Sequence, residues 1–87
     1  MLAVMPFLPD VQLGVVCRIV AIRPSERMPE CARQLRELGF LAGEQIVLLR
    51  RVLPGGDPMV VRIGTSTFAL RRAEADCIEV EAGGTHA

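Results

Sequence analysis

The sequence alternates between short aliphatic runs and turn-forming residues, a pattern typical of short β-strands. Residues 15–22 are rich in β-branched side chains. In an extended conformation Val15, Cys17, Ile19 and Ala21 would share one face. This segment is therefore predicted to be a strand of a half-buried sheet.

Four further strands are predicted after residue 40. Met59, Val61 and Ile63 alternate with polar or smaller residues and should face the core. The dense turn signal of residues 53–58 precedes that run, and residues 64–66 turn the chain back as in a hairpin. A polar connection over residues 71–76 has room for one helical turn. The predicted strands are Gln45 to Val52, Met59 to Ile63, Thr67 to Leu70 and Cys77 to Glu81.

One helix is predicted between Pro29 and Leu38. Proline suits a first helical turn, and Gly39 can adopt the positive φ that ends a helix. Cys31, Leu35 and Leu38 fall at spacings that form a narrow apolar stripe. A helix this short is not stable alone. We therefore expect Leu35 and Leu38 to cover the core of the sheet.

Five short strands with one helix inserted after the first predict an all-β fold that closes into a small barrel. Closure removes exposed sheet edges and lets a short chain surround one core. The 87 residues allow a single domain, 1–87. We expect its core over about residues 8–81, an N-terminal tail over 1–7 and a C-terminal tail over 82–87.

The amino-acid composition reduces the number of functional classes to which the protein could belong. Hydrophobic residues make up 51% of the chain, which excludes disorder, and the formal net charge is zero, which weighs against nucleic-acid binding. Three phenylalanines, with no tryptophan or tyrosine, are too few for a base-stacking platform. No segment resembles a membrane span or a cleaved leader. We expect a cytoplasmic protein that does not insert into a membrane.

The zero net charge conceals two blocks of opposite sign. Residues 45–72 contain five arginines against Asp57, and residues 73–87 contain four acidic residues and no arginine or lysine. One interpretation is a cross-strand lattice in which the blocks neutralise each other. The other is a basic surface that recognises an acidic partner.

The cysteine and histidine residues form few patterns typical of redox, metal-binding or catalytic sites. The three cysteines form no C-x-x-C motif, and Cys17 and Cys77 are expected to be small buried residues within strands. Cys31 near the helix start could join Glu30 in a metal site between chains. With His86 as the only histidine, close to the C-terminus, no catalytic constellation is visible. We therefore predict no enzymatic activity.

Two groups of residues carry a resemblance to the FeoA family, covering about Leu8 to Glu81. Each motif is weak alone, but their order and spacing together are specific. The first group is Leu35-x-x-Leu38-Gly39-Phe40-x-x-Gly43, Val47 to Val52 and Pro54-x-Gly56-Asp57-Pro58. The second is Ala69-Leu70-Arg71-Arg72-x-Glu74-Ala75-x-x-Ile78-x-Val80. The chain departs from the common form in its long apolar start, so Met5 is an alternative first residue.

The resemblance implies an SH3-like barrel with the helix after the first strand. It also implies a non-catalytic accessory protein of bacterial ferrous iron uptake. Such a protein would bind the cytosolic part of a membrane transporter that carries a GTP-binding domain. No cofactor is required, although a divalent metal could bind incidentally between chains, and a homodimer remains open.

Five residues are predicted to contact the partner. Leu38, Phe40 and Leu41 lie where the helix ends, and Phe40 and Leu41 are either core residues or part of an exposed patch. Arg71 and Arg72 are candidates for contacts with acidic groups. Because adjacent residues at a strand end point to opposite sides, at least one of them should be exposed.

Two other binding functions remain open. The chain could be a free-standing relative of the SH3-like C-terminal domain of iron-dependent repressors, binding metal or a regulator's own segment. The absence of a DNA-reading helix and of a histidine-rich ligand set counts against it. A small RNA-binding barrel is disfavoured by the zero net charge and the scarcity of aromatic residues.

Overall fold

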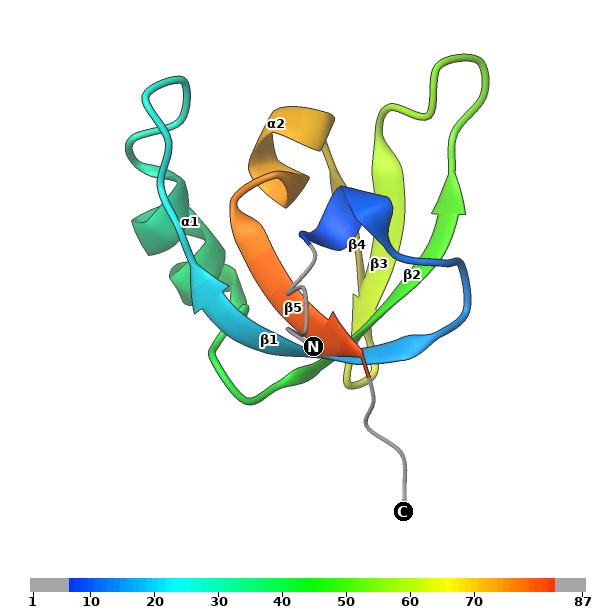
Figure 1. Ribbon diagram of the computed structural model, residues 1–87, viewed down its shortest axis with the longest axis horizontal. Helices are drawn as coiled ribbons and strands as arrows, with labels where there is room; N and C mark the ends of the chain where they lie inside the picture. The colour runs from blue at the N-terminus through cyan, green and yellow to red at the C-terminus, as the bar shows by residue number, and fades with distance from the viewer. Residues whose placement is uncertain (1–6, 83–87) are drawn as a thin grey trace, which may run out of the picture.

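A computed structural model describes residues 7–82 of the chain (Figure 1). Within them, five antiparallel strands form one curved sheet in the order β4-β3-β2-β1-β5. This is the expected all-β, SH3-like architecture with a helix after the first strand. The elements are η1 (Leu8–Asp10), β1 (Val16–Ile22), α1 (Cys31–Leu38), β2 (Gln45–Arg51), β3 (Met59–Ile63), β4 (Ser66–Leu70), α2 (Arg72–Ala75) and β5 (Ile78–Ala82).

The period-two patterns of the strands are confirmed except near two register shifts, one in the β1–β5 pairing and one in the β2–β3 pairing between Leu48 and Arg50. Met59, Val61 and Ile63 are buried, as predicted for β3. In β1, Cys17 and Ile19 are buried, but the register against β5 shifts between Ile19 and Ala21. That irregularity leaves Ala21 half-buried. Extra residues in one strand break the strict alternation of faces. Val15, the first residue of the predicted face, precedes β1 and is 36% exposed, so the predicted alternation holds for Cys17 and Ile19 alone.

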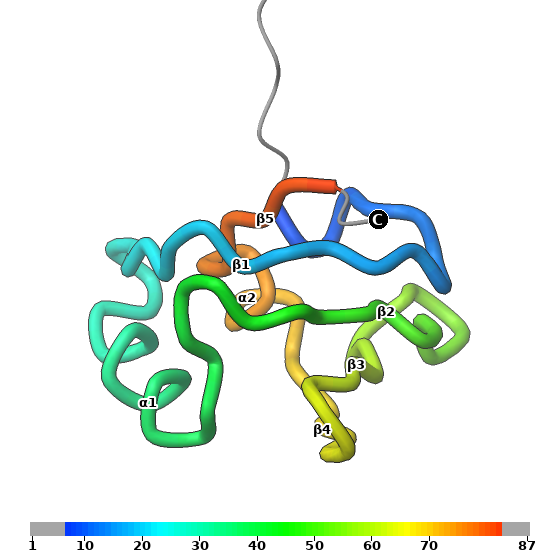
Figure 2. The backbone as a smooth tube through the Cα atoms, turned by 90° about the horizontal axis from the view of Figure 1, so that it is seen from below, coloured from blue at the N-terminus to red at the C-terminus, as the bar shows by residue number. Residues whose placement is uncertain are grey.

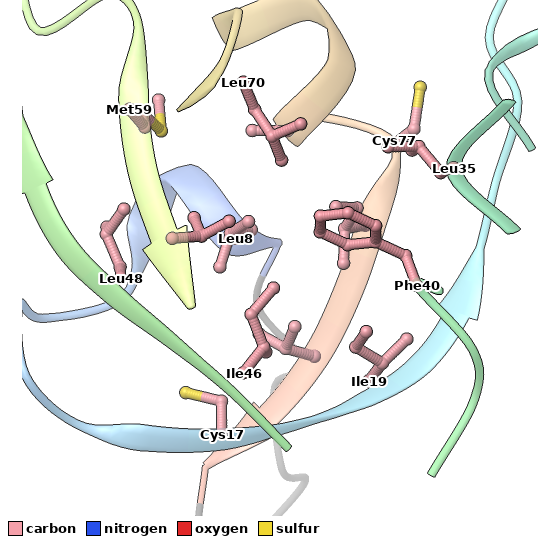
Figure 3. Close-up of a cluster of buried hydrophobic side chains, with 14 of the residues drawn as sticks. Leu8, Cys17, Ile19, Leu35, Phe40, Ile46, Leu48, Met59, Leu70 and Cys77 are labelled. Atoms are coloured by element: carbon pink, nitrogen blue, oxygen red, sulfur yellow. The ribbon is translucent and has the colours of Figure 1, made fainter. Parts of the chain in front are cut away.

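The core lies inside the curve of the sheet (Figure 3). Side chains from every strand and from α1 meet there, together with Phe40 from the chain that follows α1. Phe40 is fully buried, and its ring lies 5.1 Å from that of Phe68 on β4, centroid to centroid. Together with Leu35 of α1, Phe40 therefore adds a core side chain from outside the five strands.

Helix α1 differs from the sequence prediction in its first residue and at the last position of its apolar stripe. It begins at Cys31, not Pro29, because Glu30 occupies the N-cap position and its carbonyl accepts the first helical bond from Gln34. Leu35 is buried as predicted. Leu38, however, is 52% exposed, so its predicted core position is wrong. The chain reverses at Gly39, and Phe40 takes the core position that the stripe assigned to Leu38.

The N-terminal segment packs against the barrel through η1, an element that the hydrophobic pattern did not predict. Leu8 is fully buried and Val11 nearly so. Arg51 at the end of β2 donates to the carbonyls of Pro9 (2.8 Å) and Val11 (2.9 Å). Phe7 also bridges to Glu79 of β5. The first eleven residues therefore contribute at least two core side chains.

The remaining boundaries lie close to their predicted positions. The polar connection after β4 contains α2, the single helical turn foreseen there. Strand β5 runs to Ala82, one residue past the expected end of the core. Most of the two predicted tails, including His86 and the alternative start Met5, lies outside the described residues.

Candidate docking surface

Leu38 and Leu41 form an exposed aliphatic pair where α1 ends, with exposures of 52% and 45%. Gly39 between them has φ of 108°, a left-handed conformation that ends the helix. The N–H of Phe40 then donates to the carbonyl of Leu35 at 2.9 Å. This turn directs Phe40 inward and leaves the leucines on either side of it exposed.

Phe40 is a core residue and presents no exposed surface. The sequence left open whether it belongs to the core or to an exposed patch, and its complete burial places it in the core. Contact with a partner would require withdrawing it from Phe68 and from the hydrophobic cluster. Of the three apolar positions predicted to bind a partner, Leu38 and Leu41 are accessible.

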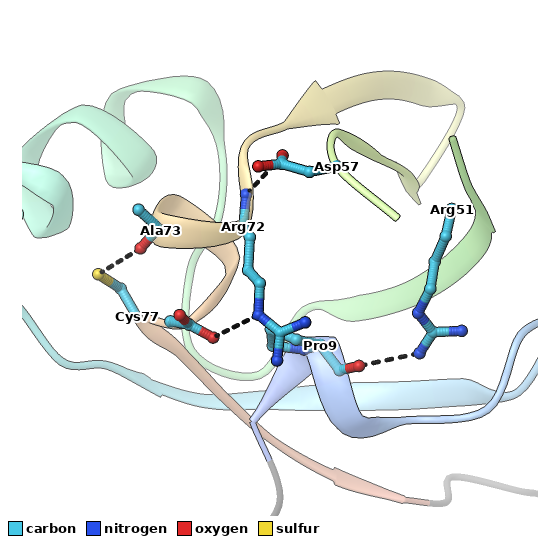
Figure 4. A network of polar contacts seen from close by, with 7 residues as sticks. Pro9, Arg51, Asp57, Arg72, Ala73 and Cys77 are labelled. Carbon is cyan, nitrogen blue, oxygen red and sulfur yellow. Dashed lines mark hydrogen bonds and ion pairs between the residues drawn. The ribbon is translucent and has the colours of Figure 1, made fainter. Parts of the chain in front are cut away.

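Arg71 and Arg72 are both exposed at the junction of β4 and α2. Their backbone N–H groups are fixed by carboxylates: Arg71 donates to Glu74 at 2.9 Å and Arg72 to Asp57 at 3.0 Å (Figure 4). The Arg72 side chain lies 3.9 Å from Asp76. The Arg71 guanidinium makes no ion pair within residues 7–82. Arg71 is thus the freer of the two cations.

The predicted docking residues form two groups on different segments. Leu38 and Leu41 belong to the end of α1, whereas Arg71 and Arg72 follow β4. The packing of Phe40 on Phe68 connects these segments, because Phe40 lies between the leucines and Phe68 lies on the strand that ends at Leu70. This core contact therefore links the segment that carries the apolar group to the strand that precedes the basic group.

The two charge blocks do not neutralise each other as a lattice. The carboxylates of β5 pair with arginines that precede the basic block: Glu81 lies 3.8 Å from Arg18, and Glu79 bonds Arg23. Among residues 7–82, Arg72 to Asp76 is the one ion pair that joins the blocks. Within the basic block, residues 45–72, three arginines consequently stay exposed and form no ion pair with the described residues: Arg50, Arg62 and Arg71. The local basic surface is the interpretation that the structure favours.

The cysteines are buried thiols. Cys17, Cys31 and Cys77 are each 1% exposed and in the free thiol form. Burial raises the pKa of Cys77 to about 12, and the neighbouring Cys31 thiol adds to this effect. Cys77 also donates to the carbonyl of Ala73 at 3.5 Å. Burial likewise raises the pKa of Cys17. These environments favour inert, protonated side chains.

Cys31 belongs to no group of three or more His, Cys, Asp or Glu side chains that could hold a metal ion within the described part of the chain. A surface hollow of about 390 Å³ lies elsewhere, lined by Arg18, Gly43, Glu44, Gln45 and Gly64. It lacks the apolar lining typical of small-molecule sites.

A small SH3-like barrel with an exposed aliphatic pair and a local basic surface has the features of a binding domain. Residues 8–82 match the model of the FeoA domain, and the chain belongs to the FeoA family. Its family is linked to ferrous iron transport. The sequence-based assignment is thereby confirmed over nearly the full length described.

Solved structures agree with this assignment. FeoA of Stenotrophomonas maltophilia is 32% identical, with a TM-score of 0.77 over 87% of this chain and 89% of that chain. That protein was solved in complex with zinc and is described as a prokaryotic SH3 domain protein and a candidate ferrous iron transport activating factor. Iron(II) transport protein A of Clostridium thermocellum is 38% identical, with a TM-score of 0.74 over 88% of this chain and 45% of that chain.

A manganese-dependent transcriptional repressor has the same fold, with a TM-score of 0.74 over 92% of this chain and 44% of that chain. At 21% identity, this likeness shows the fold alone. No curated protein sequence matches the chain significantly. Across residues 7–82, none of the helices has the length and apolar character needed to cross a membrane.

Proposed function

We propose that this protein is a non-catalytic accessory protein of bacterial ferrous iron uptake that works in the cytoplasm. It binds the cytosolic part of a ferrous iron transporter that carries a GTP-binding domain. Family membership supports the link to iron transport. The observation that carries the binding role is the exposed pair Leu38 and Leu41, which the core does not need.

The proposed contact has an apolar centre and a charged flank. Burying two leucines that are about half exposed contributes roughly 1.5–3 kcal/mol of hydrophobic free energy. That is too little for a stable complex by itself. Arg71 supplies a free guanidinium whose planar donor fork suits a carboxylate on the partner. The apolar pair would provide affinity, and the arginine would provide orientation and partner selection.

Co-purification with the transporter's cytosolic part tests this function. Folded wild-type protein should retain it, and both Leu38→Asp and Arg71→Glu should lose most of that retention. Leu53→Asp is the matched apolar control, because Leu53 is 82% exposed in the loop between β2 and β3. Arg27→Glu is the matched charge control, because Arg27 is exposed in the loop before α1. Failure of the folded wild type to retain the transporter fragment would overturn the proposal.

A further inference from the structure

Strand β4 is an open edge of the sheet. It is the last strand in the order and pairs with β3 alone within residues 7–82 (Figure 2). The β3–β4 turn consists of Gly64 and Thr65, since Ile63 pairs directly with Ser66. The opposite edge of the sheet, β5, is partly covered by the bridge between Phe7 and Glu79. An unpaired edge offers its backbone groups to another chain.

The register identifies which backbone groups are free. In a hairpin with a two-residue turn, the closing pair Ile63–Ser66 exchanges hydrogen bonds, and hydrogen-bonded pairs then alternate along the ladder. The N–H and C=O groups of Thr67 and Ala69 therefore point away from β3. Neither residue makes another backbone hydrogen bond in the described part of the chain. Two donors and two acceptors remain available along this edge.

The side chains of β4 leave that edge accessible and rigid. Thr67 and Ala69 are small, exposed and on the outer face. Between them, Phe68 points inward and packs on Phe40, and Leu70 is buried. An added strand would meet no bulky outer side chain, and the core holds β4 in the extended conformation that pairing requires.

The charges beside the edge are positive. Arg62 lies directly opposite Thr67, and Arg71 follows the last residue of β4. Both are exposed and outside ion pairs within residues 7–82. The nearby carboxylates Asp57 and Glu74 are already engaged with the backbone N–H groups of Arg72 and Arg71. A carboxylate on an added strand would therefore find cationic partners.

The same charges select against a second copy of this chain. Strand β4 contains no aspartate or glutamate, so a second β4 strand would offer no carboxylate to Arg62 or Arg71. The edge is thus suited to an acidic segment of a different protein.

We propose that the β4 edge binds an extended acidic segment of a partner protein as an additional strand. The backbones of Thr67 and Ala69 would provide the pairing, and Arg62 and Arg71 would contact alternate acidic side chains. This inference goes beyond the proposed function, because it requires neither Leu38 nor Leu41 and can be tested without a transporter.

The test uses a synthetic peptide of about seven residues that alternates valine and glutamate, the length of a short strand. A peptide with lysine in place of glutamate is its counterpart. The glutamate peptide should bind in fluorescence anisotropy, and the lysine peptide should not. By NMR, bound peptide should slow amide hydrogen exchange at Thr67 and Ala69 by about tenfold or more, because strand pairing protects those N–H groups.

Variants separate pairing from simple charge attraction. Ala69→Pro removes an outward N–H that β3 does not use, so it should abolish binding while the protein stays folded. Arg62→Glu should weaken the glutamate peptide at least about tenfold and allow the lysine peptide to bind. Arg27→Glu, the control, should change neither affinity.

Three outcomes would overturn the inference. They are absence of peptide binding to the wild type, binding without slower exchange at Thr67 and Ala69, and protection of these amides by raised protein concentration alone. The last would show that a second copy occupies the edge. Retention of the transporter fragment by Ala69→Pro but not by Leu38→Asp would show that the two surfaces act separately.

Discussion

At the scale of single residues, the titration chemistry of this protein is concentrated in its cysteines. The sequence contains no lysine and no tyrosine, so arginine supplies all ten basic side chains. Arginine stays protonated at every pH where the protein is folded. Between pH 8 and 12 the thiols are therefore the main side chains that can change charge. Burial of Cys17 and Cys77 raises the pKa of both.

The raised pKa of Cys77 predicts a loss of stability in alkali. An unfolded thiol loses its proton near the ordinary pKa of 9.0, whereas the folded one keeps it until about pH 12. The contribution is fully present below pH 9 and disappears as the pH rises towards 12, because the unfolded state is then favoured by deprotonation. Urea denaturation of the reduced protein from pH 7 to 11 measures the effect.

The double variant Cys17→Ala/Cys77→Ala is the control for this prediction. Alanine does not titrate and fits the buried positions, so the alkaline loss should be reduced. A wild-type midpoint that stays constant up to pH 11 would contradict the assignment of buried, protonated thiols.

At the scale of elements, one face of α1 packs against the core, and the C-terminal end of the helix is exposed at the surface. Cys31, Ala32 and Leu35 are buried, while Leu38 in the final turn is exposed. Gly39 and Phe40 explain the difference, since the reversed chain supplies the next core side chain itself. An aliphatic residue at the end of this helix is therefore free to serve in binding without weakening the core.

Leucine-to-alanine substitutions on α1 separate these two roles. Leu35→Ala should lower the free energy of unfolding by about 2–5 kcal/mol, because it leaves a cavity against the core. Leu38→Ala should change it by no more than about 0.5 kcal/mol. Chemical denaturation of both variants is the measurement, and equal losses would place Leu38 in the core.

At the scale of the whole molecule, the N-terminal segment completes the barrel. Leu8 is fully buried, although it belongs to a segment that lies outside the five strands. The Arg51 guanidinium holds that segment through the carbonyl of Pro9 (Figure 4) and that of Val11. One arginine of the basic block thus has a structural role, which distinguishes it from its neighbour Arg50.

Loss of the Arg51 contacts should destabilise the whole fold. Arg51→Ala removes two charge-assisted hydrogen bonds, and we expect a loss of about 1–3 kcal/mol of unfolding free energy. Arg50→Ala is the matched control, because Arg50 is exposed and in no ion pair within residues 7–82; it should cost less than about 0.5 kcal/mol. Thermal or urea unfolding compares the two. Similar values for both would mean that the contacts to Pro9 and Val11 contribute little.

The linear pattern was sufficient for the strands and turns because these depend on neighbouring residues. Alternation in β3, the turn at residues 64–66 and the glycine after α1 each reflect a local conformational preference, and each lies where it was predicted. The order of motifs was also sufficient for the family. The register shift in β1 was not visible, because it depends on pairing with a strand about sixty residues away.

The sequence by itself determined the five strands, the helix, the single small core and the FeoA family. Tertiary structure decided which apolar and charged residues remain outside. The hydrophobic period could not show which of Leu38 and Phe40 is buried, because the chain reversal at Gly39 decides which side chain points inward. Counting charges also could not show that Arg51 is bonded within the fold whereas Arg62 is not. The first meets two carbonyls of a distant segment, and the second stays free beside an open strand edge, because folding alone fixes which groups become neighbours.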